Sequence, residues 1–123
     1  MALKLFFDGG CRPNPGPMES AVVAKGRTHH RPSQGHGTNG EAEWQALLHA
    51  LDVAQALGET DVILIGDSTH ALKRAPTDPA YIAQAANFTR IRLRHTARAQ
   101  NLAGIALDRI NAGQRPPAPF EVT

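Results

Sequence analysis

The sequence has little cysteine, few aromatic residues and no apolar run long enough to cross a membrane. Its one cysteine, Cys11, excludes an internal disulfide and a zinc site built from several cysteines. Aromatic residues make up only 5% of the chain, so we expect a core of Ala, Leu, Ile and Val. The first residues lack the basic and apolar segments of a signal peptide. We therefore expect a cytoplasmic protein with no membrane anchor and no disulfide partner.

The sequence does contain enough apolar material for one folded domain. It has 123 residues, of which 41% are hydrophobic, and this size and composition are typical of a single globular domain. We place the domain at residues 1–113 and expect a loose tail at 114–123, which contains three prolines. The formal net charge of +2 favours a polyanionic partner only weakly.

Two apolar segments are each followed by an aspartate. Residues 3–7, LKLFF, precede Asp8, and the glycines and prolines of 9–17 then predict a strand that stops at Asp8 and a loop after it. Residues 62–66, VILIG, precede Asp67 and have the pattern of a strand that is buried on both faces. If the two strands are parallel neighbours, Asp8 and Asp67 lie side by side at their carboxyl ends, where open α/β sheets bind ligands.

A third acid is predicted on the buried face of a helix. The stretch 38–58 predicts this helix, with Thr38 as its N-cap and Glu41 completing a capping box. Glu43 lies one turn before Leu47 and so shares the face that packs on the sheet. An acid in such a place needs a partner.

The remaining elements follow from local patterns. We expect a strand at 20–25, a hairpin at Gly26 into an edge strand up to Gln34, short helices at 68–74 and up to Asn87, a strand at 89–95 and a last helix at 98–110. Three histidines fall near the edge strand, and they are either a metal site or, more simply, polar residues on a solvated strand: His29, His30 and His36.

The predicted strand at 89–95 alternates in polarity. Ile91 and Leu93 point inward, and three arginines point outward: Arg90, Arg92 and Arg94. These arginines either bind phosphates or form a charged edge strand that resists sheet-to-sheet aggregation, and the sequence favours neither interpretation.

The chemistry depends on Asp8, Glu43 and Asp67. Three carboxylates in a cleft of low dielectric repel one another unless a cation neutralises them. Hard oxygen ligands suit Mg²⁺ or Mn²⁺ better than zinc, and a pair of such ions can activate water for phosphodiester cleavage. The alternative is that these acids only cap helices and order loops.

Four segments, in order along the chain, resemble the type 1 ribonuclease H family, in particular its compact bacterial, archaeal and plant-like branch. They are FFDGGCRPNPGP around Asp8, TNGEAEWQALLHAL around Glu43, ILIGDSTHAL around Asp67 and HTARAQN at 95–101. The resemblance implies an α/β, ribonuclease H-like fold, with a five-stranded mixed sheet of three antiparallel strands and then parallel strands, flanked by helices. It also implies an endonuclease that hydrolyses the RNA strand of RNA/DNA hybrids with two bound Mg²⁺ (or Mn²⁺) ions.

The resemblance assigns roles to individual residues. Asp8, Glu43 and Asp67 match the first three metal-binding carboxylates, and His95 matches a mobile histidine that assists product release. Contacts to the hybrid are implied for five residues: Gly10, Cys11, Asn14, Thr38 and Asn39.

The sequence departs from the family in two places. The fourth carboxylate, four residues after Asn101, falls on Ile105, which cannot bind a cation. Asp108 could replace it only if the helix shifts or rotates, and is otherwise a solvated acid. Met18 and Glu19 stand where the family has small residues, and we expect them to alter only a turn.

Two hypotheses follow. In the first, the chain is a ribonuclease H with a weakened metal site. In the second, catalysis has lapsed, and the fold survives as a nucleic-acid-binding or protein-interaction module that uses the Asn14 loop and the arginines of 89–95. A related exonuclease is disfavoured, because Gly10 stands where a D-x-E motif has its second acid.

Overall fold

The computed structural model describes residues 1–113, and the expected tail at 114–123 lies outside the described residues. A mixed sheet forms the centre of the molecule, with its five main strands in the order β3-β2-β1-β5-β6. They are β1 (Leu3–Cys11), β2 (Gly16–Ala24), β3 (Arg27–Arg31), β5 (Asp61–Gly66) and β6 (Arg90–His95). The first three strands are antiparallel, while β5 runs parallel to both β1 and β6. The expected fold class is confirmed, with β4 (His36–Gly37) as one further short strand beside β2.

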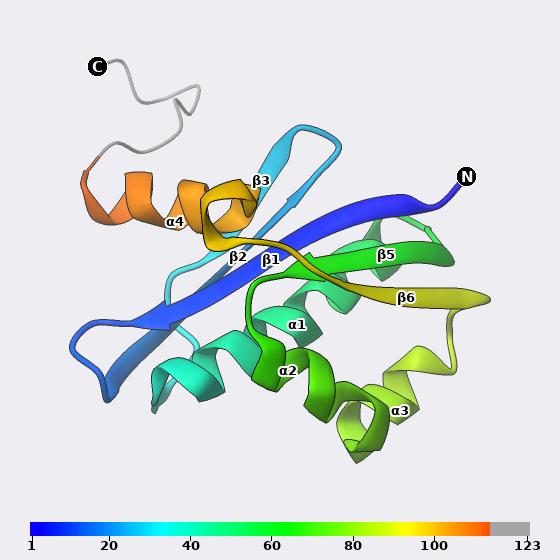
Figure 1. Cartoon of the computed structure of the whole chain (residues 1–123), viewed down its shortest axis with the longest axis horizontal. Coiled ribbons are helices and arrows are strands. Elements are labelled where there is room, and N and C mark those ends of the chain that lie inside the picture. The colour runs from blue at the N-terminus through cyan, green and yellow to red at the C-terminus, as the bar shows by residue number, and fades with distance from the viewer. Residues whose placement is uncertain (114–123) are drawn as a thin grey trace.

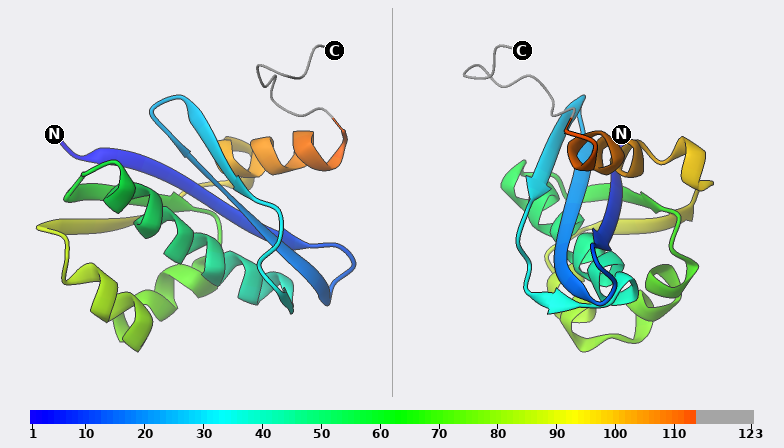
Figure 2. Two further views of the ribbon diagram at one scale, coloured as in Figure 1. Left: turned by 180° about the vertical axis from the view of Figure 1, so that it is seen from behind. Right: turned by 90° about the vertical axis from the view of Figure 1, so that its left-hand side faces the viewer.

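Helices cover both faces of the sheet. Three of them lie on one face, α1 (Asn39–Ala56), α2 (Thr69–Arg74) and α3 (Pro79–Ala85), and α4 (Leu102–Asn111) lies on the other (Figures 1 and 2). The larger core lies between the sheet and α1, and a smaller cluster under α4 joins Ala21 to Ala103 and Leu107. Among the described helices, none has the length and apolar character needed to span a membrane.

The start and stop signals of α1 are confirmed. Thr38 is the N-cap, and its side chain accepts a hydrogen bond from the Glu41 amide while the Glu41 side chain accepts one from the Thr38 amide. The chain turns away after the helix at Gly58, where φ is +73°. Because the cap fixes the first turn, it also fixes the direction in which Glu43 leaves the helix.

The prediction that the first strand stops at Asp8 is wrong, because β1 continues to Cys11. Its last residues pair with β2, from Gly9 opposite Ser20 to Cys11 opposite Met18. The parallel pairing with β5, however, ends at Phe6. Asp8 therefore still lies at the carboxyl end of the parallel part of the sheet, as expected.

The prediction that Met18 and Glu19 alter only a turn is also wrong, since β2 begins at Gly16 and includes both residues. Met18 is buried against Cys11 and Ala42. Glu19 lies on the α4 side of the sheet, where its carboxylate accepts a hydrogen bond from Asn111 at 2.8 Å.

The histidines and arginines in question lie on β3, β4 and β6. His29 and His30 lie half-buried on β3, and His36 lies on β4. Within residues 1–113, no group that includes these histidines has the geometry of a metal site. On β6, Ile91 and Leu93 pack against the core, whereas the three arginines are exposed, as predicted: Arg90, Arg92 and Arg94.

The expected last helix divides in two. A short turn, η2 (Arg98–Gln100), precedes α4, and the buried Asn101 between them caps α4 by accepting a hydrogen bond from the Ala103 amide. This cap explains why the α-helix begins at Leu102 and not at Arg98.

Candidate metal centre

Three carboxylates from separate elements converge at one end of the sheet. Asp8 belongs to β1, Glu43 to the second turn of α1, and Asp67 directly follows β5. One oxygen atom of each carboxylate lies within 4.8 Å of the corresponding atom of the other two. Asp8 is buried, and Glu43 and Asp67 are half-buried. The structure thus brings together the three acids that the sequence singled out.

Close packing of α1 on β1 brings Glu43 to this position. A side chain at Gly9 would overlap the carbonyl group of Ala42 and would lie 2.9 Å from the Glu43 amide nitrogen. Glycine at this point of β1 therefore allows the helix backbone to approach the strand directly. Because no side chain separates α1 from β1 at this point, the Glu43 carboxylate lies close to the two aspartates.

Two of these acids, Asp8 and Glu43, lie where the charged carboxylate is disfavoured. Burial raises the pKa of Asp8 to about 7, and the nearby charges of Asp67 and Glu43 add to the rise, while Arg98 opposes it. Burial also raises the pKa of Glu43, although a hydrogen bond with the Ser68 side chain works in the opposite direction. Groups that resist ionisation in this way gain from a nearby cation.

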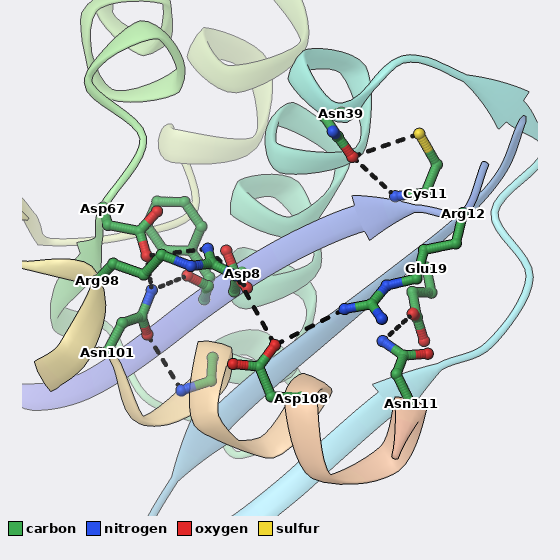
Figure 3. A network of polar contacts seen from close by, with 12 residues as sticks. Asp8, Cys11, Arg12, Glu19, Asn39, Asp67, Arg98, Asn101, Asp108 and Asn111 are labelled. Carbon is green, nitrogen blue, oxygen red and sulfur yellow. Dashed lines mark hydrogen bonds and ion pairs between the residues drawn. The ribbon is translucent and has the colours of Figure 1, made fainter. Parts of the chain in front are cut away.

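Asn101 holds the aspartate end of the cluster in place. Its side-chain nitrogen donates to the Phe7 carbonyl at 3.0 Å and to Asp67 Oδ2 at 3.2 Å, and the residue is fully buried (Figure 3). It thereby links β1, α4 and the segment after β5. The sequence identified Asn101 only as part of a motif. An asparagine directly before an apolar helical stretch is a good N-cap, so a local pattern could have indicated the cap on α4 but not the bonds to Phe7 and Asp67.

Arg98 was not singled out as a site residue in the sequence, yet it reaches the cluster from η2. Its Nη1 atom lies 3.9 Å from Asp8 Oδ2 and 3.8 Å from Asp67 Oδ2, and its Nη2 atom lies 3.8 Å from Asp108 Oδ1 (Figure 3). Arg12 also lies 3.8 Å from Asp108 Oδ1. Asp108 is therefore shared by two arginines at the edge of the site.

The face of α4 next to Asp8 differs from the expected one. A Cβ atom at Gly104 would lie 3.3 Å from Asp8 Oδ2, so Gly104 is the residue of α4 that lies against the carboxylate. Ile105, the expected fourth position, is half-buried and is not among the residues that line the cleft. Asp108 follows Gly104 by one turn, and so it lines the cleft from the same side of the helix.

A cleft of about 280 Å³ extends from the carboxylates along the sheet. Asp8 and Glu43 lie in its wall together with three residues expected to contact nucleic acid: Gly10, Cys11 and Asn39. Asn39 Oδ1 accepts a hydrogen bond from the Cys11 amide at 3.0 Å, and Asn14 Oδ1 accepts one from the Asn39 amide at 3.2 Å. Thr38 precedes Asn39 as the helix cap. Gly10, Cys11 and Asn39 thus line the cleft next to Asp8 and Glu43, and Asn14 and Thr38 lie beside Asn39.

His95 lies apart from this cleft. It is exposed at the end of β6, where it is paired with Gly66, the residue before Asp67. The structure places it near the site but not within the cluster of three acids.

The donor set fits a hard divalent cation. Each of the three converging residues offers a carboxylate oxygen, and the group contains no histidine or cysteine. Oxygen-only sets of this kind suit Mg²⁺, Mn²⁺ or Ca²⁺, while zinc and copper prefer nitrogen or sulfur ligands.

Several known proteins are similar to this chain in sequence and in fold. Ribonuclease HI of Halobacterium salinarum is 38% identical over 72 residues, which cover 51% of this chain and 34% of that protein. The matched region thus spans about a third of that relative's length. The solved structure of RNase H1 from Halobacterium salinarum superposes with a TM-score of 0.75 and 27% identity, covering 92% of this chain and 99% of that one.

A further solved structure, LC11-RNase H1 in complex with an RNA/DNA hybrid, superposes with a TM-score of 0.63 and 26% identity, covering 81% of this chain and 88% of that one. The RNase H family model matches residues 1–102, which include all three carboxylates. This match, together with the shared fold and the related sequences, shows that the chain belongs to the RNase H family.

Proposed function

We propose that this chain is a metal-dependent endonuclease that hydrolyses the RNA strand of RNA/DNA hybrids. The observation that carries the proposal is the convergence of Asp8, Glu43 and Asp67, whose oxygens lie within 4.8 Å of one another, with Asp8 and Glu43 in the wall of the cleft. Membership of the RNase H family supports the reaction class. A cytoplasmic location, which the sequence leads us to expect, is part of the same proposal.

Two Mg²⁺ or Mn²⁺ ions would supply the chemistry, since a pair of divalent cations activates the attacking water and stabilises the leaving oxygen of a phosphodiester. Asp8, Glu43 and Asp67 are the residues that would hold them. Asn101 keeps Asp67 oriented through its hydrogen bond of 3.2 Å. The tight packing of α1 at Gly9 keeps Glu43 in reach of both aspartates.

The proposed substrate is a hybrid duplex bound along the cleft. Gly10, Cys11 and Asn39 line this cleft next to the carboxylates, and Asn14 is hydrogen-bonded to the Asn39 amide. Together with Thr38, these groups would meet the shallow minor groove, where 2′-hydroxyls distinguish RNA from DNA. Support for this substrate comes from LC11-RNase H1, a relative that was solved with an RNA/DNA hybrid. We keep His95 as a candidate for assisting product release.

The metal site we propose lacks a fourth carboxylate in the position expected for it. Ile105 offers no ligand atom, and Gly104 lies against Asp8 in its stead. Asp108 lines the same cleft and is the one acid of α4 that could contribute, once it parts from Arg12 and Arg98. We therefore expect weaker binding of one of the two ions.

The second candidate function is a catalytically lapsed module that binds nucleic acid without cutting it. One observation favours it: Arg98 lies within 4 Å of both Asp8 and Asp67, so the acids have a partner within the protein. The clustered negative charge argues against it, because such charge repels a phosphate backbone when no metal is bound.

A cleavage assay separates the two candidates. A hybrid with 5′-labelled RNA is incubated in Mg²⁺ and then in Mn²⁺ with the wild type, Asp8→Asn and Glu43→Gln, next to single-stranded RNA and duplex DNA. We expect the wild type to cut only the hybrid, and both variants to lose roughly a thousandfold in rate, because metal stabilisation is worth several kcal/mol.

The matched control is Glu41→Gln, which removes an exposed acid two residues from Glu43 and leaves a capping box that glutamine can maintain. Its rate should equal that of the wild type. If the wild type cuts no faster than Asp8→Asn in either metal, the enzyme is excluded, and hybrid binding in metal-free buffer would then support the module.

A further inference from the structure

Arg98 lies within 4 Å of three acids of the site, Asp8, Asp67 and Asp108. Its Nη1 atom lies between two of the three cluster carboxylates, 3.9 Å from Asp8 Oδ2 and 3.8 Å from Asp67 Oδ2. The other end of the same guanidinium lies 3.8 Å from Asp108. Figure 3 shows the arginine reaching from the turn before α4 across the acids. One side chain of this protein thus places a positive charge beside the predicted ligand oxygens.

The contacts of Arg98 are electrostatic and easily broken. Its separations of 3.8 to 3.9 Å from the three acids are too long for hydrogen bonds, so within residues 1–113 no directional bond holds the guanidinium in place. The Arg98 side chain is 62% exposed, whereas those of Asp8 and Asp67 are 4% and 11% exposed. The arginine can therefore swing into solvent while the acids stay where the sheet holds them.

The Arg98 guanidinium and a divalent cation cannot both lie in contact with the carboxylate oxygens of Asp8 and Asp67. They carry charge of the same sign, and each gains from the same negative potential. When the arginine moves away, Asp108 loses one of the two arginine partners that it has among residues 1–113, and Arg12 remains at 3.8 Å. When Arg98 leaves, a divalent cation can therefore approach both the three clustered carboxylates and the carboxylate of Asp108 more easily.

We propose that Arg98 is a resident counter-ion of the Asp8, Glu43 and Asp67 cluster, which a divalent cation must displace, so that Arg98 sets the metal concentration that the protein requires. The inference rests on the proposed function, because it takes these acids as metal ligands. Arg98 is a residue that acts through the acids, and it contacts no substrate in this account.

The test measures binding of Mn²⁺ alone by titration calorimetry, without nucleic acid. Arg98→Ala should bind Mn²⁺ roughly three- to tenfold more tightly than the wild type, because it removes several weak ion pairs that compete with the metal. Arg98→Lys retains the charge and should bind with an affinity between the two. In EDTA, Arg98→Ala should also melt at a lower temperature than the wild type, and saturating Mn²⁺ should raise its melting temperature by a larger amount.

The matched control is Arg27→Ala, which removes the same charge from the far β2–β3 hairpin, where Arg27 is exposed and makes no ion pair with the described residues. Its Mn²⁺ affinity should equal that of the wild type. Asp8→Asn reports on the site itself and should lose most of the binding.

The outcomes separate the two claims. If Asp8→Asn loses binding but Arg98→Ala binds no more tightly than the wild type, the counter-ion role is wrong and the metal site stands. If Arg27→Ala gains as much affinity as Arg98→Ala, the effect is one of net charge and the counter-ion role is again wrong. If the wild type binds no Mn²⁺ at millimolar concentration, the metal site fails, and the counter-ion role fails with it.

Discussion

At the scale of single residues, Asp8 carries the largest electrostatic cost of the site. It is the most buried of the three acids, and the combination of burial and neighbouring carboxylates raises its pKa to about 7. The native state therefore holds a proton on Asp8 over a pH range in which the unfolded chain has released it. As a result, the ionisation of Asp8 makes the stability of the metal-free protein depend on pH.

The sign of this dependence follows from the two pKa values. Asp8 has a pKa of 3.8 in the unfolded chain and about 7 in the folded one, so its contribution is fully present below pH 3.8 and is lost as the pH rises through 7. Asp8→Asn cannot ionise and escapes this loss. In EDTA at pH 8, we expect the variant to be more stable than the wild type by roughly 2 to 4 kcal/mol.

Urea denaturation at pH 4 and pH 8 checks this prediction. The difference between Asp8→Asn and the wild type should be small at pH 4 and large at pH 8. Asp108→Asn serves as a control, because it removes an acid of the same cleft whose side chain is 59% exposed, and the gain between pH 4 and pH 8 should be larger for Asp8→Asn than for this variant. Parallel stability curves for Asp8→Asn and the wild type would contradict the account.

The residues of the site differ in how well the sequence predicts them. Asp8 and Asp67 follow apolar segments, and Glu43 lies on the apolar side of a well-capped helix, so local patterns were sufficient for all three. Asn101 and Arg98 depend on partners far along the chain, since Asn101 bonds to Phe7 across 94 positions. No local pattern contains that information.

At the scale of elements, the contact between β1 and α1 shapes the site. The two elements touch through backbone at Gly9 and Ala42, one residue from Asp8 and one from Glu43. This contact explains why β1 ends at Cys11 and not at Asp8, as the sequence pattern predicted. Glycine is a loop signal in isolation, but here it permits a strand to run beneath a helix while β2 supplies its hydrogen bonds.

Gly9→Ala should therefore disturb stability and metal binding together. A methyl group there meets the Ala42 carbonyl, and backbone cannot rotate aside as a side chain can. We expect a loss of roughly 3 kcal/mol in the free energy of unfolding, at the upper end of what overpacking costs. The shift of α1 should also weaken Mn²⁺ binding, because it carries Glu43 away from the aspartates.

The neighbouring glycine is the control. Among the described residues, a methyl group at Gly10 would meet only the Asn39 side-chain oxygen, at 3.9 Å, which is an ordinary contact. Gly10→Ala should change the stability by less than about 1 kcal/mol and leave Mn²⁺ affinity unchanged. Equal effects of the two substitutions, by denaturation and calorimetry, would show that the contact at Ala42 does not set the site.

Element order and type were predictable from sequence, but register within elements was not. The predicted strands and helices all occur, because each has its own hydrophobic periodicity and the helices also have start or stop signals. The rotation of α4 is different, since it depends on how Ala103 and Leu107 pack under the sheet with Ala21. That packing puts Gly104 against Asp8, a result that counting from Asn101 did not give.

At the scale of the whole molecule, two buried groups on different elements give stability opposite dependences on pH. Asp8 favours low pH, whereas burial lowers the pKa of His49 on α1 to about 4, so His49 favours high pH. His49 is 3% exposed, and its Nδ1 lies 2.8 Å from Ser20 Oγ of β2. The stability that His49 contributes is present above pH 6.5 and is lost as the pH falls towards 4.

His49→Gln should remove this loss of stability in acid. The variant is expected to be less stable than the wild type at pH 7, since a buried hydrogen bond is altered. The gap between the two should shrink by roughly 3 kcal/mol between pH 7 and pH 4. Denaturation of both proteins in EDTA at the two pH values provides the measurement, and a gap that is the same at both would refute the buried neutral histidine.

The sheet and α1 together bring three carboxylates to one point, where we propose that divalent cations bind. The most direct test is the anomalous scattering of Mn²⁺ in crystals of the wild type. We expect anomalous peaks in direct contact with Asp8, Glu43 and Asp67, and we expect these peaks to be lost in Asp8→Asn. Ordered Mn²⁺ elsewhere on the molecule, with no peak among these three side chains, would contradict this proposal.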